Sequence, residues 1–336
     1  MRTPQGMSAA RIKSFTTENV SKFFDLYKPQ YNKLREPFHR VFIVDETGIT
    51  VVQHKYSKVI SLKGKRQVSS LISAERGKLI TVITCMNAAD VYIPPLLIFP
   101  RKNMKAELML GAPTEAIAEC HISGWVQAEI FTKWFKHFIK FTKPSASDPV
   151  LLVLDGHCSH TRNIELIELA KENYVTIICL PPHSTNKMQP LDVAFMFPLK
   201  TYYAQEIENW LRENQLSTVS PYAVAGIFCK AYNRAATMEA SCNGFRKTGL
   251  VPLNRHVFRD SDFGVHQTED QPPVEVTDYS EAQGGCNGNE EQLSDNADTA
   301  LNLKERTKQV NNSCADAPPN DDIESIPANI PEPFRE

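Results

Sequence analysis

Two aliphatic runs that each end in an aspartate are the features that most constrain this fold. VFIV, residues 41–44, precedes Asp45, and PVLLVL, residues 149–154, precedes Asp155. Short aliphatic runs of this kind are typical of strands buried on both faces of a sheet. Because burying a lone carboxylate is unfavourable, each aspartate is expected where its strand runs out, beside a partner or a metal ion. For either aspartate taken alone, an acid that caps the strand or the next turn is the commoner explanation.

The sequence around these runs predicts an α/β fold, a mixed sheet with helices packed on its faces. Glycines and charged clusters separate the early strands, and later strands alternate with segments of helical periodicity. The expected elements are strands at 41–49, 58–62, 79–87, 149–155 and 174–180, a proline-rich connector at 93–100, and helices at 127–141 and 162–173.

Four segments are predicted along the chain. Residues 1–38 form a helical lead-in, 39–215 the α/β core, 216–260 a helical C-terminal extension and 261–336 a disordered acidic tail. The tail is assigned because it is poor in aromatic residues and rich in Asp, Glu, Asn, Pro and Gln. The segment from about 193 to 259 is predicted to be helical, and its expected core residues are Trp210, Phe228, Tyr232 and Phe245.

The net charge of −2 conceals a strong asymmetry along the chain. Residues 261–336 carry 17 acidic and 4 basic side chains, whereas residues 1–260 carry 22 acidic and 33 basic ones. A basic body attracts phosphate backbones, and an acidic tail can compete for the same surface or maintain solubility. Ordinary solvated charge accounts for the tail equally well.

Composition and length bound the function classes. With 336 residues, 42% of them hydrophobic, the chain can bury one sizeable core or two modest ones. It has no run of eighteen apolar residues and no apolar segment near its N-terminus, so neither a membrane span nor a secretory signal is expected. Eight cysteines without paired spacing predict reduced thiols of an intracellular protein.

A third acid stands within CLPPHSTNKMQPLDVAFMFPLKTYY, residues 179–203. Asp192 follows a proline-bearing loop and lies near the start of an expected helix, which it could simply cap. However, 36 residues separate it from Asp155, enough for one helix and one strand to return the chain to its starting point. Since neighbours on a strand point to opposite faces, Asp45 is expected to face this site and Glu46 to support it from elsewhere.

Three carboxylates that converge from two strands and one helix would suit two magnesium ions. Mg²⁺ prefers hard oxygen ligands and binds through a few carboxylates, water and substrate phosphate. Two such ions, about 3.5–4 Å apart, activate the attacking oxygen and stabilise the leaving oxygen in phosphoryl displacement. The expected cofactor is therefore Mg²⁺ or Mn²⁺ as two ions, with Asp45, Asp155 and Asp192 as ligands and no organic cofactor.

Directly behind Asp155, the residues His157, Cys158 and His160 offer other chemistry. Structural zinc usually requires a second ligand pair, and none stands at suitable spacing. A nucleophilic Cys158 with a neighbouring histidine would leave the other two aspartates unexplained. These residues are interpreted as the turn after the strand, with His160 able to reach a phosphate or a metal-bound water.

A basic turn follows the first expected strands. Lys63, Lys65 and Arg66 could hold the phosphates of DNA. Three charged residues in a turn are equally typical of an ordinary solvated surface, and both interpretations stay open.

Three blocks of the sequence together resemble a known family. VDETGI around Asp45, LVLDGHCSH around Asp155 and LPPHSTNKMQPLD around Asp192 resemble the catalytic blocks of the DDE superfamily endonuclease domain. More narrowly, they look like those of pogo/Tigger/jerky-type transposases of the Tc1–mariner group. The connecting text is similar as well, in ISAERGKLITVITCMNAADVYIPPLLIFPR, SGWVQAEIFTKWFKHF and GFRKTGLVPLNRHVF. The resemblance covers residues 3–263, and the combination of blocks is highly specific.

The resemblance implies a ribonuclease-H-like core that uses an aspartate triad and divalent metal to cut DNA at transposon ends. It also implies joining of the freed 3′-hydroxyl to target DNA, DNA as the partner, a homodimer or higher synaptic oligomer, and a nuclear location. Carried over by position, the metal ligands and catalytic residues are Asp45, Asp155 and Asp192. The third acid is aspartate, as in the pogo branch, and all three are present.

Two departures from the family pattern bear on function. Family members usually carry helix-turn-helix DNA-binding domains ahead of the core, whereas this chain begins at the RTP block and is expected to lack them. Asn186 and Lys187 stand where relatives often show Thr and His. The alternative function is therefore a catalytically silent, transposase-derived protein that binds or regulates nucleic acid.

Overall fold

The computed structural model describes residues 15–51, 63–64, 79–156, 163–214 and 217–263. All of them belong to one compact unit, residues 1–268, and a second unit comprises residues 269–336. The strand expected at 58–62 and nearly all of the predicted acidic tail lie outside the described residues. The fourfold division predicted from the sequence remains a prediction.

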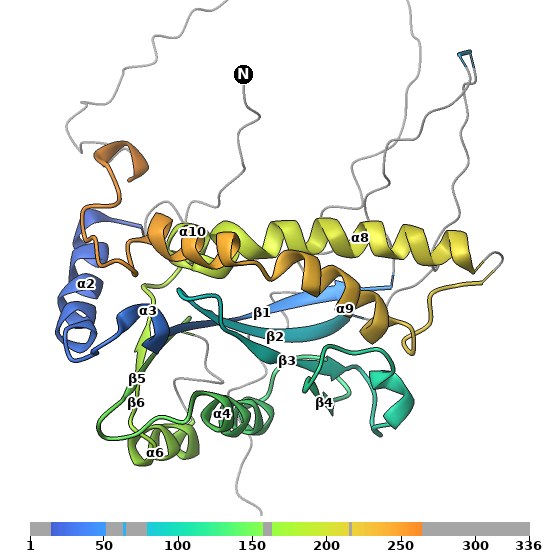
Figure 1. Cartoon of the computed structure of the whole chain (residues 1–336), viewed down its shortest axis with the longest axis horizontal. Helices are drawn as coiled ribbons and strands as arrows, with labels where there is room; N and C mark the ends of the chain where they lie inside the picture. Colours follow the sequence, from blue (N-terminus) through green and yellow to red (C-terminus); the bar gives the residue numbers. More distant parts are fainter. Residues whose placement is uncertain (1–14, 52–62, 65–78, 157–162, 215–216, 264–336) are drawn as a thin grey trace, which may run out of the picture. The chain divides into compact units, whose positions relative to one another are not determined.

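A six-stranded mixed sheet forms the centre of the described unit (Figure 1). Its spatial order is β4-β3-β2-β1-β5-β6, with β1, β2 and β3 antiparallel, β5 and β6 parallel to β1, and β4 parallel to β3. The strands β1, β2 and β3 form an antiparallel group, and β5 and β6 extend it in parallel on the other side of β1. This arrangement is that of a ribonuclease-H-like fold. The strands are β1 (Val41–Thr50), β2 (Leu79–Asn87), β3 (Tyr92–Phe99), β4 (Ile117–Cys120), β5 (Val150–Leu154) and β6 (Val175–Cys179).

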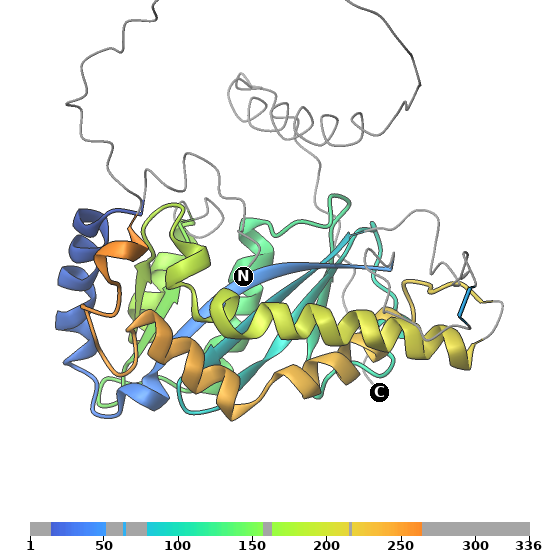
Figure 2. The ribbon, with the colours of Figure 1, turned by 90° about the horizontal axis from the view of Figure 1, so that it is seen from above.

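Helices cover both faces of this sheet. Figure 1 shows α4 and α6 on one side and α8, α9 and α10 on the other, and Figure 2 shows α8 and α9 side by side. The helices are α2 (Thr17–Tyr31), α3 (Pro37–Arg40), α4 (Ala128–Thr142), α6 (Ile164–Glu172), α7 (Thr185–Met188), α8 (Met196–Glu213), α9 (Val224–Ala235) and α10 (Met238–Thr248), with the 3-10 helices η1 (Ala106–Met109) and η3 (Asp260–Asp262) and the π-helix η2 (Leu191–Phe195). Within the described ranges, no helix combines the length and apolarity that crossing a lipid bilayer requires.

Short polar residues start several of these helices. Thr16, Asn163 and Thr237 precede α2, α6 and α10, and the oxygen of each side chain accepts the amide three residues later at 3.2 Å. At the end of α10, Gly249 adopts a positive φ of 72°, and a Cβ there would lie 2.3 Å from the carbonyl oxygen of Asn254. Glycine is therefore required at this helix end.

The segment at 93–100 is a strand, β3, and the interpretation of it as a proline-rich connector is wrong. Pairing between β2 and β3 shifts at this point, so that Pro94 and Pro95 together lie opposite the single residue Thr84. A bulge of this kind leaves residues out of the ladder of hydrogen bonds, which prolines cannot join as donors. Two prolines are thus compatible with a strand inside the sheet.

Side chains of the central strands alternate between two cores. Val41 and Ile43 of β1, with Val153 of β5, contact the core under α2, α8, α9 and α10. The residues between them contact a second core under α4 and α6, as expected for a period of two. The second-core residues on these strands are Phe42, Val44, Val150, Leu152 and Leu154.

Three of the four residues expected in the core of the helical C-terminal part are confirmed there. Phe228 and Phe245 are fully buried, and Tyr232 is 6% exposed. Trp210 is only partly buried and packs at the edge of the same core. The aromatic residues of α9 and α10 thus close the face of the sheet that carries the odd-numbered residues of β1.

Candidate metal centre

The parallel register of β1 and β5 brings the first two aspartates side by side. Pairing ends at Ile43↔Val153, and two residues further along each strand stand Asp45 and Asp155. Two residues along a strand return to the same face, so both side chains project on the side covered by α8. Both residues are half-buried.

Asp45 lies in the middle of β1, in agreement with the strand expected at 41–49, and the expectation that the strand runs out at this aspartate is wrong. β1 continues to Thr50, paired with β2 throughout, and only its pairing with β5 stops before Asp45. The aspartate therefore stands where one neighbouring strand ends and the other continues. This arrangement opens one edge of β1 at Asp45 while β2 holds the backbone in place.

Asp192 comes to the same region on η2, which leads directly into α8. η2 contacts β1, and the negative charge of Asp192 is one cause of the raised pKa of Asp45. Asp192 itself is exposed. A π-turn is an uncommon distortion that is often found at functional sites, and this one carries the third acid of the predicted set.

The loop before Asp192 is tied to both strands. At its start, the amide of Leu180 donates to the carbonyl of Leu154 at 2.8 Å. At its end, Nε2 of Gln189 donates to the carbonyl of Val44 at 3.1 Å. These two carbonyls belong to the residues that immediately precede Asp155 and Asp45.

Glu46 also takes part in the acid cluster, and the expectation that only Asp45 could face it is wrong. Carboxylate oxygens of Asp45, Glu46 and Asp155 all lie within 4.8 Å of one another. β5 ends at Leu154, so no β5 residue pairs with β1 beside Glu46. The long side chain of Glu46 can therefore pass the edge of β1 and bring its carboxylate to those of Asp45 and Asp155. Asp192 is not part of this group of three. The cluster therefore consists of three acids that lie close together and a fourth, Asp192, whose charge affects the pKa of Asp45.

Burial and like charge together raise the pKa of Asp45 well above its ordinary value of 3.8. Burial is the larger cause, followed by the negative charges of Glu46, Asp192 and Asp155. The amide of Glu46 donates to Oδ1 of Asp45 at 2.9 Å and opposes the shift. Carboxylates this close favour a bound proton or cation, which reduces their repulsion.

The donor set fits a hard divalent cation. All four side chains offer carboxylate oxygens, the ligand type preferred by Mg²⁺ and Mn²⁺. Asp45, Glu46 and Asp155 meet the distance requirement for a shared ion, and Asp192 stands nearby to complete the shell.

The remaining predicted site residues are mostly outside the described residues. His157, Cys158 and His160 are among these, as are Lys65 and Arg66. Lys63 is described and lies exposed in a turn. The phosphate contacts and the interpretation of His157, Cys158 and His160 as the turn after the strand therefore remain predictions.

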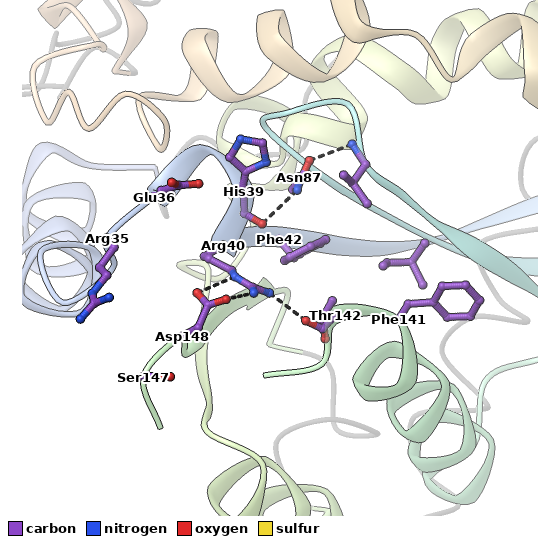
Figure 3. A pocket seen from close by; sticks show the side chains of 12 residues that line it. Arg35, Glu36, His39, Arg40, Phe42, Asn87, Phe141, Thr142, Ser147 and Asp148 are labelled. Atoms are coloured by element: carbon purple, nitrogen blue, oxygen red, sulfur yellow. Dashed lines mark hydrogen bonds and ion pairs between the residues drawn. The ribbon is translucent and has the colours of Figure 1, made fainter. Parts of the chain in front are cut away.

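A cavity of about 640 Å³ opens at the other end of the β1/β5 pair (Figure 3). Figure 3 shows the guanidinium of Arg40 between Asp148 and the carbonyl of Thr142. Nε of Arg40 donates to Asp148 at 2.7 Å, and Nη1 donates to Thr142 at 2.7 Å. Here an arginine neutralises the Asp148 carboxylate, in contrast to the clustered acids at the opposite end.

A ribonuclease-H-like sheet with carboxylates grouped beside its central strands defines the class of domain. Residues 77–239, a little under half of the chain, match the family model described as DDE superfamily endonuclease. This stretch is therefore similar to the DDE superfamily endonuclease domain. The matched stretch includes Asp155 and Asp192 and begins after Asp45.

The chain is also similar to a curated protein named MFS-type transporter clz9, from Cochliobolus lunatus. The two are 31% identical over 232 residues, which cover 68% of this chain and 25% of that protein. This chain thus spans about a quarter of the length of the curated relative it matches. The transport activity in that name refers to the whole relative.

Solved structures of the Mos1 transposase are similar at a lower level. The Mos1 strand transfer complex matches with 14% identity and a TM-score of 0.44, covering 74% of this chain and 61% of that one. The Mos1 paired-end complex with Mn matches with 15% identity and a TM-score of 0.40, covering 70% and 64%. The catalytic domain of Mos1 mariner transposase matches with 11% identity and a TM-score of 0.35, covering 74% and 98%.

Proposed function

We propose that this domain is a metal-dependent DNA endonuclease of the transposase type, with Asp45, Asp155 and Asp192 as metal ligands and catalytic residues. The observation that carries the proposal is the convergence of these carboxylates from β1, the end of β5 and η2. The match to the DDE superfamily endonuclease family supports the reaction class. Strand transfer to target DNA is the second reaction proposed for the same residues.

The acids would hold the divalent ions from different sides of the site. Asp45 and Asp155, adjacent in parallel register, would share one ion, and Glu46 would contact it or orient its water ligands. Asp192, exposed on η2, would face the solvent side, where a phosphodiester can approach. When bound, Mg²⁺ or Mn²⁺ would activate the attacking oxygen and stabilise the leaving oxygen of phosphodiester cleavage.

The partner proposed for this surface is DNA. The excess of basic side chains over residues 1–260 would favour a polyanion, and Lys63 is an exposed candidate for a phosphate contact. We further propose the pogo/Tigger/jerky branch, because the sequence blocks around the three aspartates resemble those of that branch, whose third acid is also an aspartate. Two bound ions, a synaptic dimer or larger oligomer, and a nuclear location are part of the same proposal.

Nicking of supercoiled plasmid by the full chain in Mg²⁺ or Mn²⁺ tests this function. Wild type is expected to give open-circular product, and Asp155→Asn is expected to reduce the rate by more than about 100-fold, since ligand loss exceeds the 10–100-fold typical of outer-shell partners. Asp148→Asn is the matched control, because Asp148 lies at the other end of the same strand pair and is held by Arg40.

Two outcomes would overturn the nuclease proposal. The first is wild-type protein that binds DNA and cuts none in either metal, which would support the silent, regulatory alternative. The second is cleavage that Asp155→Asn leaves unchanged, which would place the activity elsewhere or in a contaminant.

A further inference from the structure

We infer that Gln189 is the positioning residue for the third acid: its side-chain amide sets Asp192 beside Asp45. The inference rests on the proposed function, because it assigns Gln189 a role in holding the metal ligands together. Gln189 itself contacts neither DNA nor metal in this assignment. It acts through the backbone of the loop and of β1.

The contact that carries the inference is buried and long in sequence. Gln189 has no exposed surface, and its Nε2 lies 3.1 Å from the carbonyl oxygen of Val44, 145 residues away in the chain. A carbonyl can only accept, so the amide nitrogen must face it. The carbonyl oxygen of the amide, Oε1, is also buried and has no hydrogen-bond partner among the described residues. One hydrogen bond thus fixes this side chain.

This hydrogen bond lies where the sheet no longer supports β1 from the β5 side. Pairing between the strands ends at Ile43↔Val153, and Val44 is the next residue. Gln189 therefore continues a strand-like contact one residue beyond the last strand pair. Val44 and Asp45 stay paired with β2, so this hydrogen bond positions the loop against a backbone that is already held.

The neighbours of Gln189 transmit its position to Asp192. Met188 and Leu191, on either side, are fully buried in the core. A Cβ on Gly244 of α10 would lie 2.8 Å from the carbonyl oxygen of Pro190, so α10 packs closely on the next residue. The segment is held by apolar contacts and by one polar contact to β1, and Asp192 stands three residues after that contact.

Apolar packing alone would leave the height of η2 over the sheet weakly defined, because hydrophobic contacts have little directionality. A hydrogen bond to a fixed backbone carbonyl has a preferred length and angle. Gln189 therefore defines the separation between Asp192 and Asp45. Loss of the amide should weaken metal binding through Asp192 and leave the contributions of the other acids in place.

The test uses Gln189→Met, which keeps a similar shape and removes the donor. Mn²⁺ affinity measured by calorimetry without DNA is expected to fall about 10–100-fold, the range found for residues that orient metal ligands. In an Asp192→Asn background, the same substitution should change Mn²⁺ affinity less than about 2-fold, because pairs that act through one contact are non-additive.

The matched control is Tyr27→Phe, which also removes one buried hydrogen bond from a side chain to a distant carbonyl. The hydroxyl of Tyr27 donates to Leu250 at 3.1 Å, and Tyr27 has no exposed surface. This substitution should leave Mn²⁺ affinity unchanged. Metal-free hydrogen exchange should show faster exchange at residues 191–195 in Gln189→Met, with α4 unaffected, which separates local release from general unfolding.

The inference fails if wild type binds Mn²⁺ in a manner that depends on Asp192 and Gln189→Met binds it equally well. It also fails if Gln189→Met weakens Mn²⁺ binding by the same factor with and without Asp192. The failure of the proposed function has a different signature, because wild type would then show no Mn²⁺ binding that depends on Asp45 or Asp155.

Discussion

The two ends of the β1/β5 strand pair carry charge in opposite ways. Before the paired segment, Arg40 forms an ion pair with Asp148 through two of its nitrogens. A third nitrogen of Arg40 donates to the carbonyl of Thr142. Beyond it, Asp45 and Asp155 meet as like charges. The same two strands thus end in a neutralised pair on one side and in clustered acids on the other.

This difference separates a structural carboxylate from a functional one. Asp148 obtains its countercharge from the chain itself, so its ionisation is compatible with a folded protein that binds nothing. The charged neighbours that shift the pKa of Asp45 are all carboxylates. A proton or an external cation would relieve that repulsion, which makes this end responsive to pH and to metal.

The largest expected effect comes from removing an acid at the clustered end. Asp45→Asn should weaken Mn²⁺ binding by more than about 100-fold, beyond the 10–100-fold typical of outer-shell partners. Asp148→Asn should leave Mn²⁺ affinity within about 2-fold of wild type, because its partner is Arg40. Calorimetric titration of both variants checks this, and equal losses in the two would contradict the comparison.

Adding or removing metal should change the stability of the protein through the Asp45/Asp155 end of the strand pair alone. Mn²⁺ at 100 times its dissociation constant should raise the free energy of unfolding by about 2.7 kcal/mol, and EDTA should reverse the change. Asp155→Asn should abolish this gain, whereas Asp148→Asn should retain it. Denaturant titrations with Mn²⁺ and with EDTA provide the measurement, and a gain retained in Asp155→Asn would count against the site.

The clustered end should also set a pH dependence in the absence of metal. The folded-state pKa of Asp45 is raised above its ordinary 3.8, so the folded protein binds the proton more tightly than the unfolded chain does. Stability should therefore fall as pH rises from about 4 toward that raised value, by at most about 1.4 kcal/mol per pH unit for one proton.

Asp45→Asn should remove this fall, because asparagine does not titrate. Thermal unfolding in EDTA across the pH range compares the two proteins, with Asp148→Asn as the control that keeps the slope. The assignment to Asp45 would be wrong if Asp45→Asn and wild type lost stability in parallel as pH rises.

The smallest expected effect lies at the neutralised end. Arg40→Met should lower the free energy of unfolding by about 1 kcal/mol, because the Asp148 carboxylate is 45% exposed and water screens the pair. Mn²⁺ affinity should not change. Urea unfolding and calorimetry on one preparation test both statements, and a concurrent loss of metal binding would show that the two ends are coupled.

Much of the sheet could be predicted because its strands are coded locally. The aliphatic runs of β1, β2 and β5 are buried on both faces, and their composition alone indicates strands. β3 was missed, because Pro94 and Pro95 argue against a strand until the bulge opposite Thr84 is known. A bulge is a property of two paired strands and leaves no signal in one of them.

The candidate site was predictable to a similar degree. Asp45, Asp155 and Asp192 were selected from strand ends and spacing, and the fold brings them into one region. Glu46 was set aside on the two-residue period of a strand, which describes the direction of the Cβ and not the reach of a long side chain. Gln189 was missed, although a glutamine within the apolar text Met-Gln-Pro-Leu could have indicated a buried polar contact.

The sequence by itself determined which residues can form strands and which acids can bind a cation, since both depend on local composition and on side-chain chemistry. The tertiary structure decided which acids meet. Register between β1 and β5 places Asp45 beside Asp155, and a hydrogen bond from Gln189 to Val44 joins the loop of Asp192 to the same strand. Such contacts link residues more than a hundred positions apart, and only the folded chain holds them together.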